Sequence, residues 1–314
     1  MIWWSGFKFA VLAMMLMSVF SLSAVRADST SQYRQIDPVL VIGSYFRAIN
    51  SGDYQAAYSY WQQPDKRTEQ QFAQGFANTT SARLLVRLPV FVDAGAGNFY
   101  ATIPTWVIAT HVDGSTHDYA GCFTLHKTDV PVGNATVPDL NWYIQTGDLQ
   151  EQSTLNVSYL DTSCQGIYNL GSGLFQNQQI SPIMVIQGYF DALATAQTIP
   201  AAVKAAAYWV RLGGDTLQVD YSDQLALASS LDLFIDPTVT FSSASQTAFP
   251  ILLNIAQQDA CPWLLSGCMT TRILDIPKGN LAAANPNWYI TDGTFGHASD
   301  VQDAVNGLGS ICSS

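Results

Sequence analysis

Charged side chains are scarce in this chain. They make up 12% of its residues, about half the share found in ordinary soluble domains. Basic residues are fewer than acidic ones, with 13 Lys and Arg against 24 Asp and Glu, and the net charge is -11. Proteins that bind nucleic acids or anionic membranes depend on clustered Lys and Arg. We therefore expect neither a nucleic acid nor an anionic lipid surface as a partner.

Common catalytic and metal-binding motifs are also missing. The sequence has no CxxC pair, no HExxH motif, no glycine-rich phosphate loop and no nucleophile elbow, and its four histidines are scattered. Zinc sites need closely spaced Cys and His ligands, and phosphate loops need a run of glycines. We expect no metal and no cofactor.

The first 27 residues have the pattern of a secretory signal peptide. Lys8 supplies a positive charge, residues 9–25 form an apolar run interrupted only by serines, and small or tolerated residues precede a cleavage point before Asp28. The run has the minimum length for a membrane span, so an uncleaved anchor is the alternative. We expect an exported protein, periplasmic or extracellular, without a stable membrane anchor once the signal is cleaved.

Much of the remaining sequence occurs twice. Four pairs of similar segments lie 144 to 148 residues apart and keep their order. The pairs are 41–48 with 185–192, 57–61 with 205–209, 121–122 with 267–268, and 141–144 with 287–290. A period this long is that of whole domains and not of a solenoid unit. We predict two domains of similar fold at 28–152 and 181–314, with a linker at 153–180.

The five cysteines follow the repeat. Cys122 corresponds to Cys268, while Cys164 and Cys312 each follow the last predicted strand of their domain. In an oxidising compartment the simplest pairing is Cys122–Cys164 and Cys268–Cys312, which tethers the start of the linker to the first domain. Cys261 is left over; it could be a buried free thiol or compete for Cys268.

Local patterns predict helices followed by strands in each domain. Asp37-Pro38 and Ser181-Pro182 each place a capping side chain before a proline at the first helical position. Farther along, the hydrophobic pattern changes from a helical period to a period of two. Helices are predicted from Pro38 to Gly52 and at 54–62, 69–76, 182–195 and 200–211, and strands at 83–92, 100–112, 116–127, 139–148, 229–242, 247–258, 264–275 and 287–295. This order indicates an α+β fold, in which Pro237 and Pro250 suggest bulged or edge strands.

Two segments of the first domain resemble a known superfamily. The helix pair carries Tyr45-Phe46-x-Ala48-Ile49-Asn50-x-Gly52-Asp53-Tyr54-x-Ala56-Ala57-Tyr58, and the last strand carries Asn141-Trp142-Tyr143-Ile144. They resemble the first helix pair and the last strand of the NTF2-like (ketosteroid-isomerase-like, SnoaL-like) superfamily. The resemblance implies two tandem NTF2-like cones, each an N-terminal helix pair packed on a curved antiparallel sheet. It implies no single function, because the superfamily holds isomerases, dehydratases, hydrolases, transport factors and exported proteins without an assigned activity.

Enzymes of this superfamily place an acid or a histidine inside the cone, where burial adjusts its pKa for proton transfer. The candidates here are His111 and Asp113 at the end of the long predicted strand, and Asp118 on its partner strand. In one interpretation His111 is a base oriented by Asp113 or Asp118. In the other, all three are solvated residues around a hairpin turn. The second domain carries Gln257 and Leu264 where the first has His111 and Asp118, which favours a protein without catalytic activity.

Aromatic residues are what both domains keep. Large rings at equivalent positions are typical of a packed core, but they also form pockets for apolar small molecules. The expected pocket-lining residues of the first cone are Tyr45, Tyr58, Trp61, Phe72, Phe76 and Trp106.

Together these patterns favour an exported, non-catalytic binding or scaffold module with an apolar pocket in at least the first cone. The alternatives are a single-cone acid–base enzyme and a closed-cone protein-interaction domain. Because cones of this superfamily often pair through their sheets, we expect a monomer whose two domains form an internal pseudo-dimer.

Overall fold

The structure is a computed structural model that describes residues 37–62, 67–131, 133, 136–153, 157–164, 181–194, 228–238, 241–243, 245–257, 260–274 and 287–312. The expected signal peptide, the expected helix at 200–211 and residues 165–180 of the expected linker lie outside these ranges. Within them, no helix is both long enough and apolar enough to cross a membrane.

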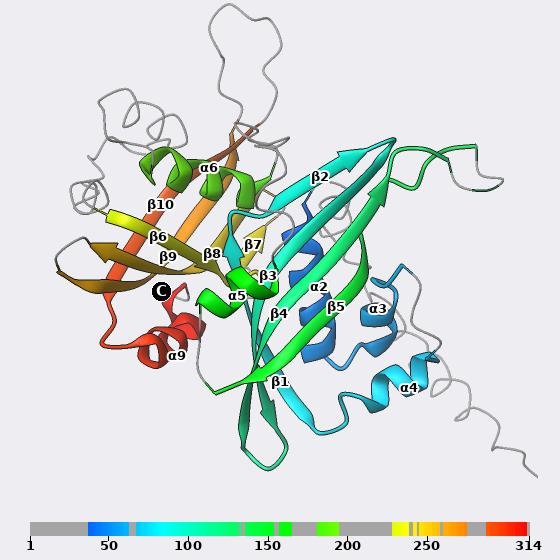
Figure 1. Cartoon of the computed structure of the whole chain (residues 1–314), viewed down its shortest axis with the longest axis horizontal. Helices are drawn as coiled ribbons and strands as arrows, with labels where there is room; N and C mark the ends of the chain where they lie inside the picture. The colour runs from blue at the N-terminus through cyan, green and yellow to red at the C-terminus, as the bar shows by residue number, and fades with distance from the viewer. Residues whose placement is uncertain are drawn as a thin grey trace, which may run out of the picture.

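The described strands form one continuous antiparallel sheet (Figure 1). They are β1 (Thr79–Leu88), β2 (Phe91–Gly95), β3 (Asn98–His111), β4 (Thr116–Thr128), β5 (Tyr143–Gln152), β6 (Ala228–Ile235), β7 (Phe241–Ser243), β8 (Gln246–Gln257), β9 (Ala260–Leu274) and β10 (Asn287–His297). The order is β10-β9-β8-β6-β1-β3-β4-β5, with β2 paired to β3 and β7 paired to β8. The two halves of the chain therefore meet edge to edge, through β1 and β6.

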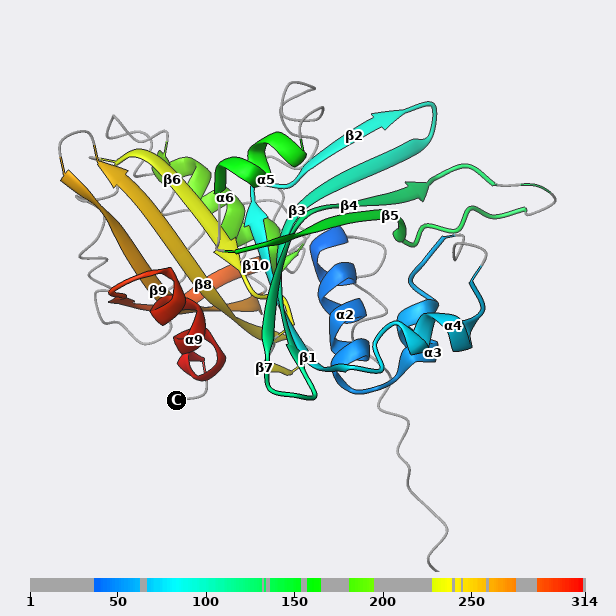
Figure 2. The same cartoon turned by 60° about the horizontal axis from the view of Figure 1, so that its bottom comes forward.

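Helices cover both faces of this sheet. They are α2 (Pro38–Asn50), α3 (Tyr54–Tyr58), α4 (Glu69–Gln74), α5 (Val157–Ser163), α6 (Pro182–Ala194) and α9 (Val301–Ile311). The face that carries α2, α3, α4 and α6, here the inner face, has one large apolar cluster with side chains from both halves; Figure 2 shows α2, α3 and α4 below the strands of the first half. The other face, here the outer face, carries α5 and α9 over a smaller cluster. The fold is thus mixed α+β with a large antiparallel sheet.

Apart from α3 and α4, the described elements follow the same order in both halves. A helix, five strands and a final helix run as α2, β1 to β5 and α5 in the first half, and as α6, β6 to β10 and α9 in the second. Pro104 and Pro250 occupy corresponding points of β3 and β8. On either side of Pro250, β8 changes partner from β7, at Ala248, to β6, at Ile251. A proline there removes no N–H that a regular ladder needs.

Some predicted boundaries were wrong. The predicted strand at 83–92 is divided at Pro89 into β1 and β2, and the one at 229–242 is divided at Pro237 into β6 and β7. Proline cannot donate a ladder hydrogen bond, so each strand stops there and the chain starts a new one. The helices α5 and α9 lie where the sequence predicted only a linker and a tail.

An arginine joins the two halves on the outer face. Arg87 of β1 forms an ion pair with Asp232 of β6 at 2.6 Å and another with Asp161 of α5. Asn254 donates a hydrogen bond to Asp232 at 3.2 Å. Burial alone would lower the pKa of Arg87, but the two carboxylates outweigh it and raise the pKa. Because the guanidinium is largely buried, removing one of its carboxylate partners should cost more than breaking a surface ion pair would.

The caps of the two equivalent helices touch each other. Asp37 caps α2 by accepting hydrogen bonds from Val39 N at 2.9 Å and Leu40 N at 3.4 Å. Its other oxygen accepts a hydrogen bond from the Ser181 hydroxyl, and Ser181 also accepts one from Met184 N at 3.1 Å in α6. Asp37 is only 2% exposed. Burial raises its pKa to about 6, although these hydrogen bonds oppose the change.

Both α2 and α6 also contact a turn of the other half. Arg47 of α2 donates a hydrogen bond to Pro237 O at 3.0 Å, and Gly43 passes so close to Pro237 that a Cβ there would collide with it. In return, Gln187 of α6 accepts a hydrogen bond from Val90 N at 3.4 Å, in the turn after β1. The halves are therefore coupled by helices as well as by strands.

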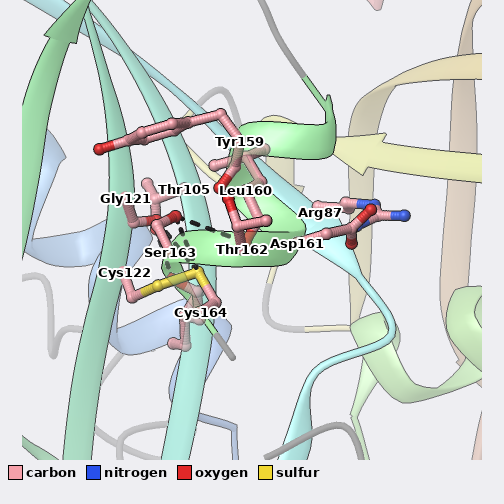
Figure 3. The surroundings of a disulfide bond; sticks show 11 residues. Arg87, Thr105, Gly121, Cys122, Tyr159, Leu160, Asp161, Thr162, Ser163 and Cys164 are labelled. Atoms are coloured by element: carbon pink, nitrogen blue, oxygen red, sulfur yellow. Dashed lines mark hydrogen bonds and ion pairs between the residues drawn. A yellow bond between two sulfur atoms is a disulfide. The ribbon is translucent and has the colours of Figure 1, made fainter. Parts of the chain in front are cut away.

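Both predicted disulfides are confirmed. Cys122 on β4 is bonded to Cys164 after α5, with their Cα atoms 5.7 Å apart, and Cys268 on β9 is bonded to Cys312 after α9, at 5.3 Å. Figure 3 shows the first bond beside α5. Each bond holds the last helix of its half against the outer face. Two such bonds are compatible with an oxidising, exported location.

The glycine before each of these strand cysteines is required by packing. A Cβ on Gly121 would collide with the carbonyl of Asp148 in β5, and one on Gly267 with the carbonyl of Thr294 in β10. The repeated Gly-Cys pair thus combines two roles on one strand. The glycine lets the edge strand approach, and the cysteine holds the helix.

We predict that Asp37→Asn stabilises the protein at neutral pH and not in acid. The folded-state pKa of Asp37 lies above its unfolded value, so its contribution to stability is full below about pH 4 and is lost as the pH rises toward about 6. Asparagine keeps the cap without a charge, and the gain above pH 6 should be roughly 2–3 kcal/mol. Urea unfolding at pH 4 and pH 8 measures it. Asp53→Asn, at the exposed cap of α3, is the matched control; equal effects of both changes at pH 8 would contradict the prediction.

We predict that replacing both cysteines of either disulfide by serine costs about 3–4 kcal/mol of unfolding free energy, because the loops they close span 42 and 44 residues. Urea unfolding of the two double variants measures the loss. Cys261→Ser is the control and should leave both disulfides in place, as read from a non-reducing peptide map. Recovery of a Cys261–Cys268 peptide from the unmodified protein would show that the pairing is wrong.

Candidate functional site

Aromatic rings line the inner face of the first half. Tyr45 of α2 is 4% exposed and stands at their centre. Its ring centroid lies 5.1 Å from that of Phe46, 6.1 Å from Trp61, 6.4 Å from Phe72 and 6.2 Å from Phe123. Most of these contacts are edge-to-face, which is a favoured geometry for aromatic pairs. Burial raises the pKa of the Tyr45 hydroxyl.

The short helices α3 and α4 add further rings to this group. Phe72 of α4 is 5% exposed, and its centroid lies 5.6 Å from Tyr58 and 5.1 Å from Phe76. Phe76 stacks on Tyr54 at 5.9 Å. The Tyr58 hydroxyl donates a hydrogen bond to Arg67 O at 2.6 Å, which ties α3 to the residues just before α4.

Trp61 is positioned by a short parallel contact with β5. Gln62 N donates to Ile144 O at 2.9 Å, and Ile144 N donates to Tyr60 O at 2.8 Å. Because these residues pair with a strand, α3 ends earlier than the sequence predicted. The contact places Trp61 opposite Ile144, with both side chains in the inner cluster.

A lysine lies over two rings at the end of β4. The Nζ atom of Lys127 is 5.1 Å from the centroid of Trp142 and 5.1 Å from that of Phe99. These distances are within the range of a cation–π interaction. Partial burial lowers the pKa of Lys127, and the charge of Asp129 partly offsets this.

Two indole N–H groups of this face are buried without a hydrogen-bond acceptor among the described residues. They belong to Trp61 and Trp142. The indole of Trp61 lies close enough to the Tyr45 hydroxyl to lower the pKa of that hydroxyl slightly, against the larger effect of burial. The geometry between the indole N–H and the hydroxyl oxygen is nevertheless not that of a hydrogen bond. Buried donors are nearly always paired, and an unpaired one costs about 1–3 kcal/mol. Two in one patch therefore need a physical explanation.

Trp106 does not belong to this group. It is buried on the outer face with Leu85, Ala120 and Leu160 of α5. Side chains alternate along β3, and Val107 is the neighbour that faces inward. Of the six expected pocket residues, the structure thus brings five together on one face: Tyr45, Tyr58, Trp61, Phe72 and Phe76.

The three candidate catalytic residues lie at the β3–β4 hairpin. His111 stacks on His117 with ring centroids 4.6 Å apart. Asp113 is exposed in the turn and accepts a hydrogen bond from Ser115 N at 2.9 Å, which lowers its pKa. Partial burial raises the pKa of Asp118. Within this described hairpin no hydrogen bond joins His111 to either carboxylate, and across the described ranges no three metal-ligating side chains come together.

His126 has a fuller set of partners than the candidates at the hairpin. Its Nδ1 lies 2.7 Å from Gln62 Nε2, its Nε2 lies 2.9 Å from Asn98 Oδ1, and its ring stacks on Tyr100 at 4.7 Å. An amide nitrogen donates and an amide oxygen accepts, so these contacts keep the proton on Nε2 of a neutral ring. Burial lowers the pKa of His126 in the same direction. The residue ties the ends of β3 and β4 to the segment after α3.

Sequence reasoning missed Lys127 and Phe99 as members of the site. One available signal was alternation, because Lys127 follows the inward-facing Phe123 and Leu125 at a spacing of two. The other was the repeat, in which Ile273 stands where the first half has Lys127. The charge at this inward-facing position is therefore confined to the first half.

Comparison with known proteins gives a structural likeness. No protein-family model and no curated protein matches this chain. A solved structure of a nuclear transport factor 2 (NTF2-like) superfamily protein from Salmonella enterica subsp. enterica serovar Typhimurium is similar to part of it, with 14% identity and a TM-score of 0.28. The match covers 42% of this chain and 96% of that chain. A likeness at this level carries no argument about function.

We predict that Phe72→Ala destabilises the protein by about 3–5 kcal/mol, because it opens a cavity among Tyr45, Tyr58 and Phe76. Val112→Ala, at an exposed apolar position of the same half, is the control and should cost at most about 0.5 kcal/mol. Thermal or urea unfolding measures both. Equal effects of the two substitutions would show that the aromatic group does not contribute to the core.

Proposed function

We propose that the protein is an exported, non-catalytic binding module whose ligand site lies on the inner face of its first half. In this proposal, residues 28–152 and 181–314 form two tandem NTF2-like cones, and residues 153–180 connect them. The matching element order and the matching disulfides support the duplication. The signal-like start of the sequence and the disulfides support export.

The aromatic group carries this proposal. Ligand sites for small molecules are mostly apolar and hold a few well-placed polar groups. The inner face of the first half has this character, since its rings are accompanied by Lys127 and by two indole N–H groups. The hairpin that bears His111 is exposed and lacks such surroundings. We therefore favour binding over acid–base catalysis.

A second candidate function is a protein-interaction domain with closed cones. Tyr45 and Phe72 are almost completely buried against other rings, which supports an interior filled by its own side chains. In that case binding would use the outside of the molecule. The two proposals differ in one measurable property, which is whether an apolar small molecule enters the first cone.

We predict that the purified protein binds a neutral aromatic probe, 4-fluorobenzyl alcohol, as detected by fluorine NMR. Trp61→Leu should weaken this binding at least tenfold, because it removes a ring from the site while keeping an apolar side chain. His111→Ala, at the hairpin, is the control and should leave binding unchanged. A folded protein that fails to bind the probe would favour the closed interaction domain.

A further inference from the structure

We infer that the contact between Asp37 and Ser181, the caps of α2 and α6, is a proton-sensitive latch between the two halves. The latch is closed while the Asp37 carboxyl carries a proton, and it opens locally when that carboxyl ionises. This inference concerns the junction of the halves and is independent of the ligand site proposed above.

The latch consists of two side chains that each cap one helix and also bind each other. Asp37 Oδ1 accepts hydrogen bonds from Val39 N at 2.9 Å and Leu40 N at 3.4 Å, and Asp37 Oδ2 accepts one from the Ser181 hydroxyl. The Ser181 oxygen in turn accepts one from Met184 N at 3.1 Å. Asp37 is 2% exposed and Ser181 is fully buried. Both side chains are therefore shielded from water while the two helix starts are in contact.

The charged side chains of the surrounding described elements do not compensate a negative charge on Asp37. Those of α2, α6, β1, β6 and the residue after β6 are Arg47, Asp191, Arg83, Arg87, Asp232 and Asp236. Arg47 donates to Pro237 O at 3.0 Å, whereas Arg83 and Arg87 belong to contacts of the outer face. The pKa of Asp37 is governed first by burial and then by its hydrogen bonds, and none of these charges contributes to it. An ionised Asp37 is therefore balanced by hydrogen bonds alone.

Separation of the two helix starts is the smallest movement that brings Asp37 into water. The ends of helices open at a lower free energy than the strands at the centre of a sheet. The β1–β6 pairs and the ion pairs of Arg87 do not involve either cap. They hold the halves together while the first turns of α2 and α6 move apart, so the latch opens without unfolding the sheet.

The direction of the pH effect follows from the solvation of the carboxyl. Burial raises the pKa of Asp37 from 3.8 to about 6 in the closed latch, and solvation in the open latch restores the ordinary value. A protonated carboxyl can donate to the Ser181 oxygen, so the closed latch needs no buried charge in acid. Between about pH 4 and pH 6 only the open latch loses its proton, which favours opening, and above about pH 6 the effect is complete. Opening should be roughly fiftyfold more favourable at pH 7 than at pH 4.

The second half provides an internal comparison. Pro38 and Pro182 begin equivalent helices, and the residue before them is Asp37 in the first half and Ser181 in the second. A serine hydroxyl caps a helix without ionising in this pH range. Asp37→Ser therefore copies the cap of the second half, while Asp37→Asn keeps the size of the side chain and removes its charge.

Amide hydrogen exchange of the purified protein at pH 4 and pH 7, read by NMR and corrected for the intrinsic rate at each pH, tests the inference. The amides of Val39, Leu40 and Met184 report on the latch, because each donates to one of its two side chains. We expect their protection to fall roughly fiftyfold from pH 4 to pH 7. At pH 7 they should also exchange at least tenfold faster than the amides of the β3–β4 ladder, because the opening is local.

Two substitutions of Asp37 should remove this pH dependence. In Asp37→Asn the three amides should have the same corrected protection at both pH values, and Asp37→Ser should give the same result if the asparagine variant fails to fold. Asp191→Asn is the matched control on α6. Burial also raises the pKa of Asp191 to about 6, but this residue lies almost three turns beyond Ser181. The fiftyfold change should therefore persist in Asp191→Asn.

Three outcomes would overturn the inference. One is a change of protection that persists when Asp37 is replaced, which would assign the pH dependence to another group. Another is equal protection of the three amides at pH 4 and pH 7 in the unmodified protein. The third is exchange at the caps that is no faster than exchange in the β3–β4 ladder at pH 7, because the opening would then be complete unfolding.

Discussion

The pairing of β1 with β6 is the constraint on which the rest of the structure depends. Three residue pairs, from Val86 with Ile235 to Leu88 with Leu233, turn two five-strand arrays into one sheet. In this continuous sheet α2 and α6 lie on the same face, and their first turns meet. The buried contact between Asp37 and Ser181 is a consequence of that meeting. It joins two helix caps at the cost of placing a carboxyl group where its ionised form is poorly solvated.

The two faces of the sheet have different roles, and strand alternation separates them residue by residue. The outer face holds the chain together: it carries both disulfides, both terminal helices and the arginine network at the junction. The inner face of the first half carries the rings and the donors. Neighbours on β4 show the division, since His126 ties strand ends together on one face while Lys127 lies over Trp142 on the other.

Features encoded locally or by spacing could be predicted from the sequence. The start of α2 follows from Asp37-Pro38, and the disulfides follow from the place of each cysteine in the repeat. The edge-to-edge junction could not be predicted, because strand pairing between distant segments leaves no local pattern. The face of Trp106 was missed for a related reason: a shift of one residue in a strand moves every side chain to the opposite face. Lys127 was missed because attention went to histidines and acids, whereas this lysine lies over the rings of Phe99 and Trp142.

The two halves are alike in what supports the fold and different in what could bind a ligand. Gly267-Cys268 and Trp288 keep the packing roles of their counterparts, yet the second half has apolar Ile273 where the first has Lys127. A physical role for the second half follows from the sheet. Without β6, the edge of β1 would present unpaired N–H and C=O groups beside an apolar face, a known liability for aggregation. The second half covers that edge and supplies Pro237, against which α2 packs. Because α2 carries Tyr45, the ring at the centre of the aromatic group, the contact with Pro237 makes the second half help to position that group.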